Sequence, residues 1–221
     1  MFASNVYKER REALRRQVGG GLILLLGNGE ASSNYPDNTY HFRQDSSFLY
    51  FFGINHPGFA GVIDVEAGEE TLFGNDFTMD DIIWMGPQSS VASQAAEVGV
   101  EKSAPLSQLK QVIEAAQRQG RQVHFLPPYR HANKWWLEEL TGIRAAPFAA
   151  QVSVELIKAI VALRSVKSAL EIAEIERACD IGYEMHTAAM KMCREGIIER
   201  EIAGRIEGIA KSMGLGVSFP S

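Results

Sequence analysis

The sequence predicts an α/β fold followed by a stretch of helix, and two observations carry this prediction. In the first part of the chain, apolar runs typical of strands alternate with segments of helical periodicity, which indicates layers of helix on sheet. From Val152 the pattern is helical until residues 216–219. About 60 residues of helix bury too little apolar surface for a core of their own. We therefore expect a complete α/β domain and the opening helices of a second, truncated one.

The elements follow from local patterns in chain order. A helix is expected over residues 4–16, with Ser4 as its N-cap, and Gly19–Gly21 ends it. Five aliphatic residues, 22–26, predict a buried strand, and residues 32–38 have the composition of a turn. The later expected elements are strands at 48–52, 60–65, 70–73 and 123–126, the middle two forming a hairpin, and helices at 89–98, 106–119, 152–163 and 199–213.

A strict helical stripe precedes the last of these helices. Its members recur at alternating steps of three and four residues: Ile172, Ile175, Cys179, Gly182, His186, Ala189 and Cys193. His186 is therefore expected in a core or an interface, and the two cysteines are expected to pack as small hydrophobic residues. Two cysteines are too few for a disulfide framework, which favours reduced thiols in a cytosol.

The net charge is −5 and is unevenly distributed. Residues 18–101 hold one cation, Arg43, against twelve anions. Such an acidic block repels phosphate backbones, so a nucleic-acid partner is not expected. The longest aliphatic run is far shorter than the roughly 20 residues of a membrane span, and the N-terminal residues lack the apolar region of a signal peptide. We therefore expect a cytoplasmic protein without a membrane partner.

Motifs for catalysis are weak in this sequence. Residues 27–32 resemble G-x-G-x-x-G, but Ser32 replaces the third glycine and no helix follows, so a turn at the end of a strand is favoured over a dinucleotide site. The five histidines show no paired metal-ligand spacing, and G-x-S-x-G is missing. The sequence thus predicts no catalytic residue and no metal ligand in this chain.

Three residues are candidates for a structural or interface role. Arg43 lies two residues from Asp45 in an aromatic segment, and a buried or half-buried guanidinium needs a carboxylate or carbonyl partner. We expect both residues to fix local structure, with an interface to another domain or subunit as the alternative. Trp84 precedes Met-Gly-Pro, and the residues alone favour a core position over an exposed interface anchor.

The order of several motifs resembles the Xaa-Pro aminopeptidases (aminopeptidase P) of the creatinase/prolidase group. These motifs are Phe42-Arg43-Gln44-Asp45-Ser46 with Phe48, Tyr50 and Gly53; Leu163–Ile172; Met185–Lys191 with Cys193, Gly196 and Glu199; and Gly216–Ser221. The resemblance implies that residues 1–160 form the N-terminal domain of that family, with a mixed sheet and flanking helices of ribonuclease-H-like type. It further implies that residues 161–221 begin the catalytic "pita-bread" domain.

The resemblance also implies an activity for the full-length protein. Members of the family remove the residue that precedes proline at the N-terminus of a peptide, using two divalent metal ions, often manganese. The family's metal ligands lie beyond the equivalent of Ser221, so this chain alone is expected to be inactive and without a cofactor. Prolidase, which acts on dipeptides, and a non-catalytic peptide- or histone-binding module of the same architecture are the alternatives.

Trp84 gains a second interpretation from the resemblance. Asp80, Trp84 and Gly86 match the family's D-x-x-x-W-x-G context, in which the tryptophan lies near the active site of a neighbouring subunit. This implies that Trp84 contributes to substrate binding in trans. It also implies proline-containing peptides as partners and a homodimer or a higher homo-oligomer.

Overall fold

The computed structural model describes residues 1–144, 148–214 and 216–218. They divide into two compact units, Met1–Arg164 and Ser165–Ser221. The assignment of the second unit to a catalytic domain stays a prediction.

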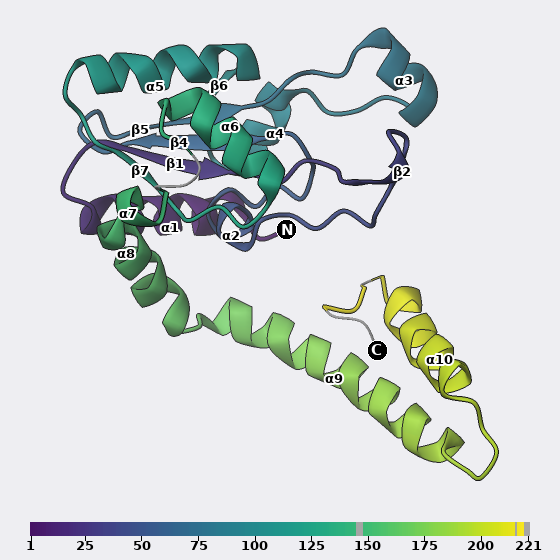
Figure 1. Cartoon of the computed structure of the whole chain (residues 1–221). Coiled ribbons are helices and arrows are strands. Elements are labelled where there is room, and N and C mark those ends of the chain that lie inside the picture. Colours follow the sequence, from purple (N-terminus) through teal and green to yellow (C-terminus); the bar gives the residue numbers. More distant parts are fainter. Residues whose placement is uncertain (145–147, 215, 219–221) are drawn as a thin grey trace. The chain divides into compact units, whose positions relative to one another are not determined.

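A five-stranded mixed sheet forms the centre of the first unit (Figure 1). Its strands, in spatial order, are β6 (Lys102–Ala104), β5 (Glu69–Phe73), β4 (Ala60–Asp64), β1 (Leu22–Leu26) and β7 (Val123–Phe125). β4 runs antiparallel to both of its neighbours, while β1 pairs with β7 and β5 pairs with β6 in parallel. The predicted α/β class, the mixed sheet and the β4–β5 hairpin are therefore confirmed.

Helices cover both faces of this sheet. One face packs against α1 (Ser4–Gln17), α2 (Ser46–Phe52), α4 (Val91–Glu97) and α8 (Val154–Ser165), and the other against α5 (Leu109–Arg118) and α6 (His131–Thr141). The short helices η1 (Leu106–Gln108) and α7 (Phe148–Gln151) also belong to this unit. β1 is apolar throughout because Ile23 and Leu25 enter the first core and Leu22 and Leu24 enter the second.

The aromatic run 48–52 is a helix, so the expected strand is wrong. Phe48, Phe51 and Phe52 are fully buried at helical spacing on one face of α2. Asp45 begins the helix, since its Oδ1 accepts the backbone N–H groups of Ser47 and Phe48, both at 2.9 Å. Gly53 ends it at φ 68°, in the left-handed region that favours glycine.

Two further expectations need correction. Ala3, not Ser4, is the N-cap of α1, and its side chain makes no capping hydrogen bond. The expected turn at 32–38 is a short antiparallel ribbon of β2 (Ser32–Tyr35) and β3 (Asn38–Thr39), because only Pro36 and Asp37 form the bend and the polar residues on either side of it pair as strands.

Arg11 on α1 is the fully buried guanidinium of this unit. Its Nε donates to Glu70 Oε2 at 2.6 Å, and its Nη atoms donate to the carbonyls of Phe51, Val98 and Gly99 at 2.9–3.0 Å. Burial lowers the pKa of Arg11, while the charge and hydrogen bond of Glu70 act in the opposite direction. This one side chain therefore joins α1 to β5, to the end of α2 and to the segment after α4.

The second unit is a helical hairpin of α9 (Ala169–Met192) and α10 (Glu199–Ser212). α9 begins with a capping box between Ser168 and Glu171, as the sequence pattern S-x-x-E favours. His186, Cys179 and Cys193 are exposed in this unit, so a core position is wrong for all three, and the interface alternative for His186 stays a prediction. Two helices cover only one side of each other, which leaves much of the stripe accessible.

The expected strand at the end of the sequence is not formed by residues 216–218. Phe219, its last residue, lies outside the described residues.

Candidate functional surface at the carboxyl edge of the sheet

Three of the four connections that leave the sheet at its carboxyl edge form one surface. Because β1, β5 and β7 run in the same direction, the segments that follow them all begin at the carboxyl edge. These segments carry the β2–β3 ribbon, the helix α3 (Met79–Met85) and residues 127–130 (Figure 1). Ligands of α/β proteins commonly bind outside the carboxyl ends of the strands, so this edge is the candidate functional surface.

Gln44 fixes the connection between β1 and α2. Its side chain is buried, and its Oε1 accepts the backbone N–H groups of Asn28 at 2.7 Å and of Asp45 at 2.8 Å. Its Nε2 donates to the carbonyls of Ile54 at 3.3 Å and of His56 at 2.7 Å. Gln44 thereby pairs with four backbone groups, of which one follows β1, one lies at the start of α2 and two follow its end.

Asn28 extends this polar network toward β7. Its Nδ2 donates to the Arg43 carbonyl at 2.8 Å and to Tyr129 Oη at 3.0 Å, and its Oδ1 accepts from Asn133 Nδ2 at 3.2 Å. Asn133 Nδ2 also lies 3.3 Å from the Gly27 carbonyl. A buried network with this many partners holds the loops after β1 and β7 in one arrangement.

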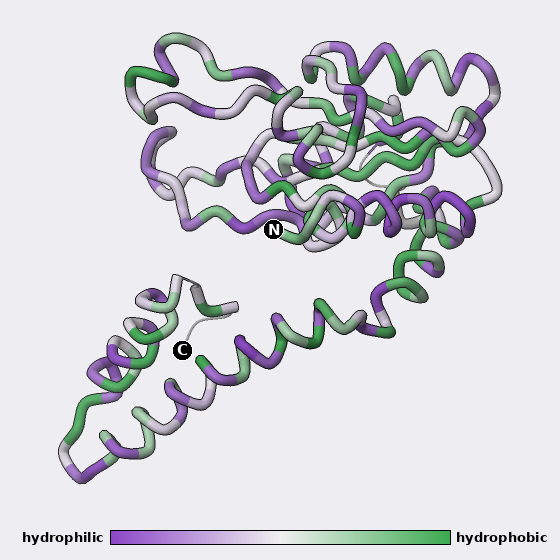
Figure 2. Tube along the Cα trace, turned by 180° about the vertical axis from the view of Figure 1, so that it is seen from behind, coloured by the Kyte–Doolittle hydropathy of each residue, from purple (hydrophilic) through white to green (hydrophobic). Residues whose placement is uncertain are grey.

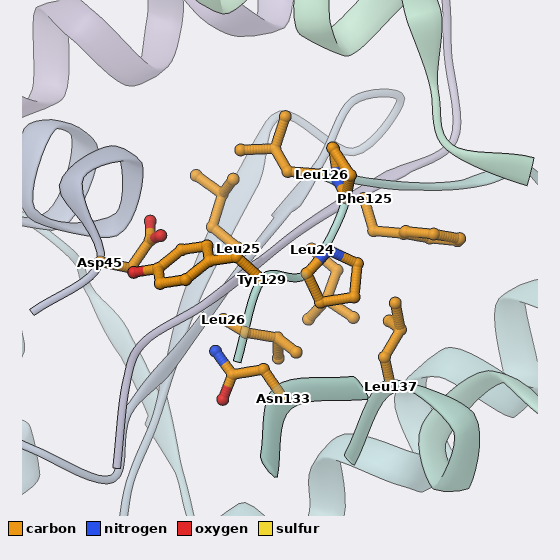
Figure 3. A pocket seen from close by; sticks show the side chains of 11 residues that line it. Leu24, Leu25, Leu26, Asp45, Phe125, Leu126, Tyr129, Asn133 and Leu137 are labelled. Atoms are coloured by element: carbon orange, nitrogen blue, oxygen red, sulfur yellow. The ribbon is translucent and has the colours of Figure 1, made fainter. Parts of the chain in front are cut away.

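A small hollow lies beside the network (Figure 3). Its volume is about 40 Å³. Its walls are mostly apolar, with Leu26, Pro127 and Pro128 among them, and Asp45, Tyr129 and Asn133 supply the polar groups. That volume holds a few water molecules at most, so the hollow is too small to receive a peptide.

Arg43 is exposed, which contradicts its expected burial. It donates to the Gln44 carbonyl at 3.0 Å and to Ser46 Oγ at 3.3 Å, and no carboxylate of the described residues pairs with it. Arg43 lies just before a helix and not within a strand, so no sheet covers it. Asp45 caps α2 as described above. An interface role for either residue stays a prediction.

Trp84 is the most exposed large apolar side chain of this surface, at 88%. The core position that the residues alone favoured is therefore wrong. α3 begins with a capping box between Thr78 and Asp81 and ends at Gly86, whose φ of 76° favours glycine. Hydrogen bonds from Thr78 lower the pKa of the half-buried Asp81 carboxyl, so this group carries its negative charge at neutral pH.

The histidines do not form a metal centre. His124 is buried, with Nδ1 2.6 Å from Ser153 Oγ and Nε2 2.8 Å from the Gly20 carbonyl, so both ring nitrogens have structural partners. The other four histidines are exposed. Across residues 1–144, 148–214 and 216–218, no three His, Cys, Asp or Glu side chains come together as metal ligands. No helix in these same ranges is long and apolar enough to cross a membrane.

Sequence reasoning missed the residues that build this surface. Asn28, Gln44, Tyr129 and Asn133 come from distant segments, and no local pattern connects them. One signal was available for Asn28, because it follows a buried strand within a Gly-Asn-Gly turn.

The first unit is thus an α/β domain with a mixed sheet and a polar network at its carboxyl edge, and solved peptidases contain this fold. Aminopeptidase P from E. coli with the inhibitor Pro-Leu superposes with a TM-score of 0.78 at 25% identity, over 96% of this chain and 50% of that chain. Proline aminopeptidase P II from Yersinia pestis also superposes with a TM-score of 0.78, at 23% identity, over 96% of this chain and 51% of that chain.

Residues 7–126 match the family model "Aminopeptidase P, N-terminal domain". This is more than half of the sequence, and the chain therefore belongs to that family. The Xaa-Pro aminopeptidase of Escherichia coli K12 is 28% identical over 209 residues, which is 90% of this chain and 47% of the relative. The Xaa-Pro dipeptidase of Homo sapiens is 28% identical over 211 residues, 92% of this chain and 41% of the relative. The chain spans less than half the length of each.

Proposed function

We propose that this chain is the N-terminal part of a cytoplasmic Xaa-Pro peptidase, in which it supports oligomerisation and shapes the access of peptide substrates. The observation that carries the proposal is the family match over residues 7–126, together with relatives named as Xaa-Pro aminopeptidases. The carboxyl-edge surface supports the role in access, because its loops are held by buried hydrogen bonds while α3 is exposed. A human Xaa-Pro dipeptidase among the relatives keeps prolidase as the second candidate.

The proposal for the whole protein includes two divalent metal ions, and manganese is the expected metal. The described residues of this chain do not supply a set of three ligands for such an ion. The proposed contribution of the chain is therefore binding and positioning of the peptide, and its isolated form is expected to be inactive.

Activity of the full-length protein tests this function. Incubation with an Xaa-Pro-Xaa tripeptide should release the first residue, while the matched tripeptide with alanine in place of proline should stay intact. Hydrolysis confined to Xaa-Pro dipeptides would favour prolidase. Binding of peptides with no hydrolysis under any metal condition would favour the non-catalytic module and contradict the proposal.

Trp84 is proposed to border the substrate path of a neighbouring subunit. Its exposed position on α3 supports this role, and the indole N–H can only donate, so Trp84 would bind and orient a peptide but not transfer a proton. Loss of an aromatic anchor commonly costs about 2 kcal/mol or more in binding, so Trp84→Ala should lower kcat/KM by about 30-fold.

Mixed oligomers decide whether Trp84 acts in trans. Full-length Trp84→Ala is mixed with a variant that lacks a metal ligand, and the subunits are allowed to exchange. If Trp84 serves the neighbouring active site, a mixed dimer regains one complete site and activity rises toward half of the wild-type value. Activity that stays at the level of the separate variants, after exchange is verified by mass, would place Trp84 within its own subunit.

A further inference from the structure

α3 presents an apolar surface that the first unit leaves uncovered. Four of its seven residues are large, apolar and exposed, namely Met79 (72%), Ile83 (71%), Trp84 (88%) and Met85 (55%). Single exposed apolar residues are ordinary, but four on one short helix form a patch of the kind that marks an interaction site. Figure 1 shows that α3 lies beyond the end of the sheet, and Figure 2 shows apolar residues within this projecting segment.

The segment that carries α3 is anchored at both of its ends. At the start, Asn75 Oδ1 accepts from Leu106 N at 3.1 Å, and Asp76 Oδ1 accepts from Val91 N at 2.6 Å. At the other end, Gln94 Nε2 donates to the Ser89 carbonyl at 3.0 Å. These bonds fix the two ends of the segment, and the capping box stabilises the first turn of α3, none of whose residues is buried.

The charges carried by the α3 segment itself are negative. Residues 75–90 contain no Lys or Arg and three Asp, namely Asp76, Asp80 and Asp81, which lie just before α3 or in its first turn. Asp76 and Asp81 are engaged in hydrogen bonds that shape the segment. Asp80 is exposed, and no described residue pairs with it. Its carboxyl group is therefore accessible to a partner.

We propose that α3 is a docking surface for cationic peptides, with Trp84 and its apolar neighbours contacting the peptide and Asp80 selecting its positive charge. Lys and Arg side chains suit this surface because their stems pack on apolar groups, while the cation is attracted to the indole face and to the carboxylate. An anionic membrane surface and an acidic peptide are both repelled by the same charges. A second copy of the chain, with its net charge of −5, is a poorer match than a cationic peptide.

The inference rests on the proposed function and adds a substrate class to it. If α3 borders the path of the substrate, peptides that carry Lys or Arg are concentrated at the entrance and acidic peptides are disfavoured. Such a preference acts mainly through rim charges, so it should weaken as salt shortens the screening length from about 30 Å at 0.01 M to about 3 Å at 1 M.

Fluorescence anisotropy of the 221-residue chain tests the docking surface. Two labelled, proline-free peptides are compared, one of alternating Lys and Leu and one with Glu in place of each Lys. The cationic peptide should bind about 10-fold more tightly in 20 mM salt, and most of this preference should vanish in 500 mM salt. Equal affinities for the two peptides, or a preference that salt leaves unchanged, would overturn the proposal.

Variants of single residues locate the site. Trp84→Ala and Met79→Ser should each weaken binding of the cationic peptide, the first by about 30-fold as expected for an aromatic anchor. Asp80→Lys should weaken it about 5-fold, and Glu139→Lys, the same reversal at an exposed residue of α6, should change it less than 2-fold. Equal effects of Asp80→Lys and Glu139→Lys would show a response to net charge alone and contradict the assignment.

Two outcomes separate this inference from the proposed function. Cationic binding that depends on Trp84, without Xaa-Pro hydrolysis by the full-length protein, would support the docking surface and refute the peptidase. Xaa-Pro hydrolysis with no preference for cationic peptides would leave the peptidase standing and refute the docking surface. Self-association of the chain that Trp84→Ala abolishes would show that a second copy occupies α3, and would also refute it.

Discussion

Replacement of Arg11 by methionine should destabilise the first unit more than any surface change on the same helix. The guanidinium is fully buried and joins Glu70 to three backbone carbonyls, which belong to Phe51, Val98 and Gly99. Methionine fills a similar volume but donates no hydrogen bond. The carboxylate, whose side chain is 12% exposed, and the three carbonyls would then be left without their partner.

The expected loss follows from these contacts. Breaking a buried ion pair by removing one partner typically costs about 3–5 kcal/mol, because the remaining charge is desolvated and uncompensated. We therefore expect Arg11→Met to lower the free energy of unfolding by about 4 kcal/mol. In a unit of this size each kcal/mol shifts Tm by about 2–4 °C, so Tm should fall by roughly 8–16 °C. Arg11→Lys keeps the positive charge but not the planar set of guanidinium donors, so it should lower the free energy of unfolding less than Arg11→Met does.

Urea unfolding followed by circular dichroism measures this loss. Arg16→Met is the matched control, since Arg16 is exposed on the same helix and the change should stay within about 0.5 kcal/mol. A loss below about 1 kcal/mol for Arg11→Met would refute the reasoning, because it would mean that water or another donor replaces the guanidinium at little cost.

Two further predictions concern carboxylates of the first unit. Asp45→Ala removes the acceptor of two N–H groups at the start of α2, and should lower the free energy of unfolding in urea by about 1–2 kcal/mol; an unchanged midpoint would contradict its capping role. Burial acts to raise the pKa of Asp64, but hydrogen bonds from Arg121 and from a backbone N–H outweigh burial and lower this pKa. Hydrogen bonds from a backbone N–H and from Arg121 also lower the pKa of Glu66. Both folded pKa values lie below the unfolded ones, so the two carboxylates stabilise the fold above the unfolded pKa of about 4, and this stabilisation is lost as the pH falls through the folded values. Tm should therefore drop more between pH 5 and pH 3 in the native chain than in Arg121→Met. Equal drops in the two proteins would contradict this reasoning.

Local patterns were sufficient to assign a helix or strand where one hydrophobic period dominated the segment. Residues 22–26 are aliphatic without interruption, which fits a strand covered on both faces, and the hairpin of β4 and β5 follows from two short runs around a glycine-containing turn. The long stripe of α9 likewise fixed a helix, since steps of three and four residues match only the helical period.

Short aromatic segments could not be assigned in the same way. Over residues 48–52 the β-propensity of aromatic residues favoured a strand, yet Phe48, Phe51 and Phe52 pack as one helical face. The decisive contacts are tertiary, because the close approach of β4 at Gly61, where a Cβ would collide with the Phe52 ring, accommodates this helix.

The sequence by itself determined the α/β class, the hairpin, the long helix and the family, because each depends on patterns that lie close together in the chain or on motifs in a fixed order. Only the tertiary structure decided which polar residues are buried. It places Arg11, one of five cations in residues 8–16, in the core and leaves Arg43, the one cation of residues 18–101, exposed. It also exposes Trp84, for which the neighbouring residues in the sequence favoured a core position. The physical reason is that burial depends on which distant segments cover a side chain, and a local pattern carries no information about those segments.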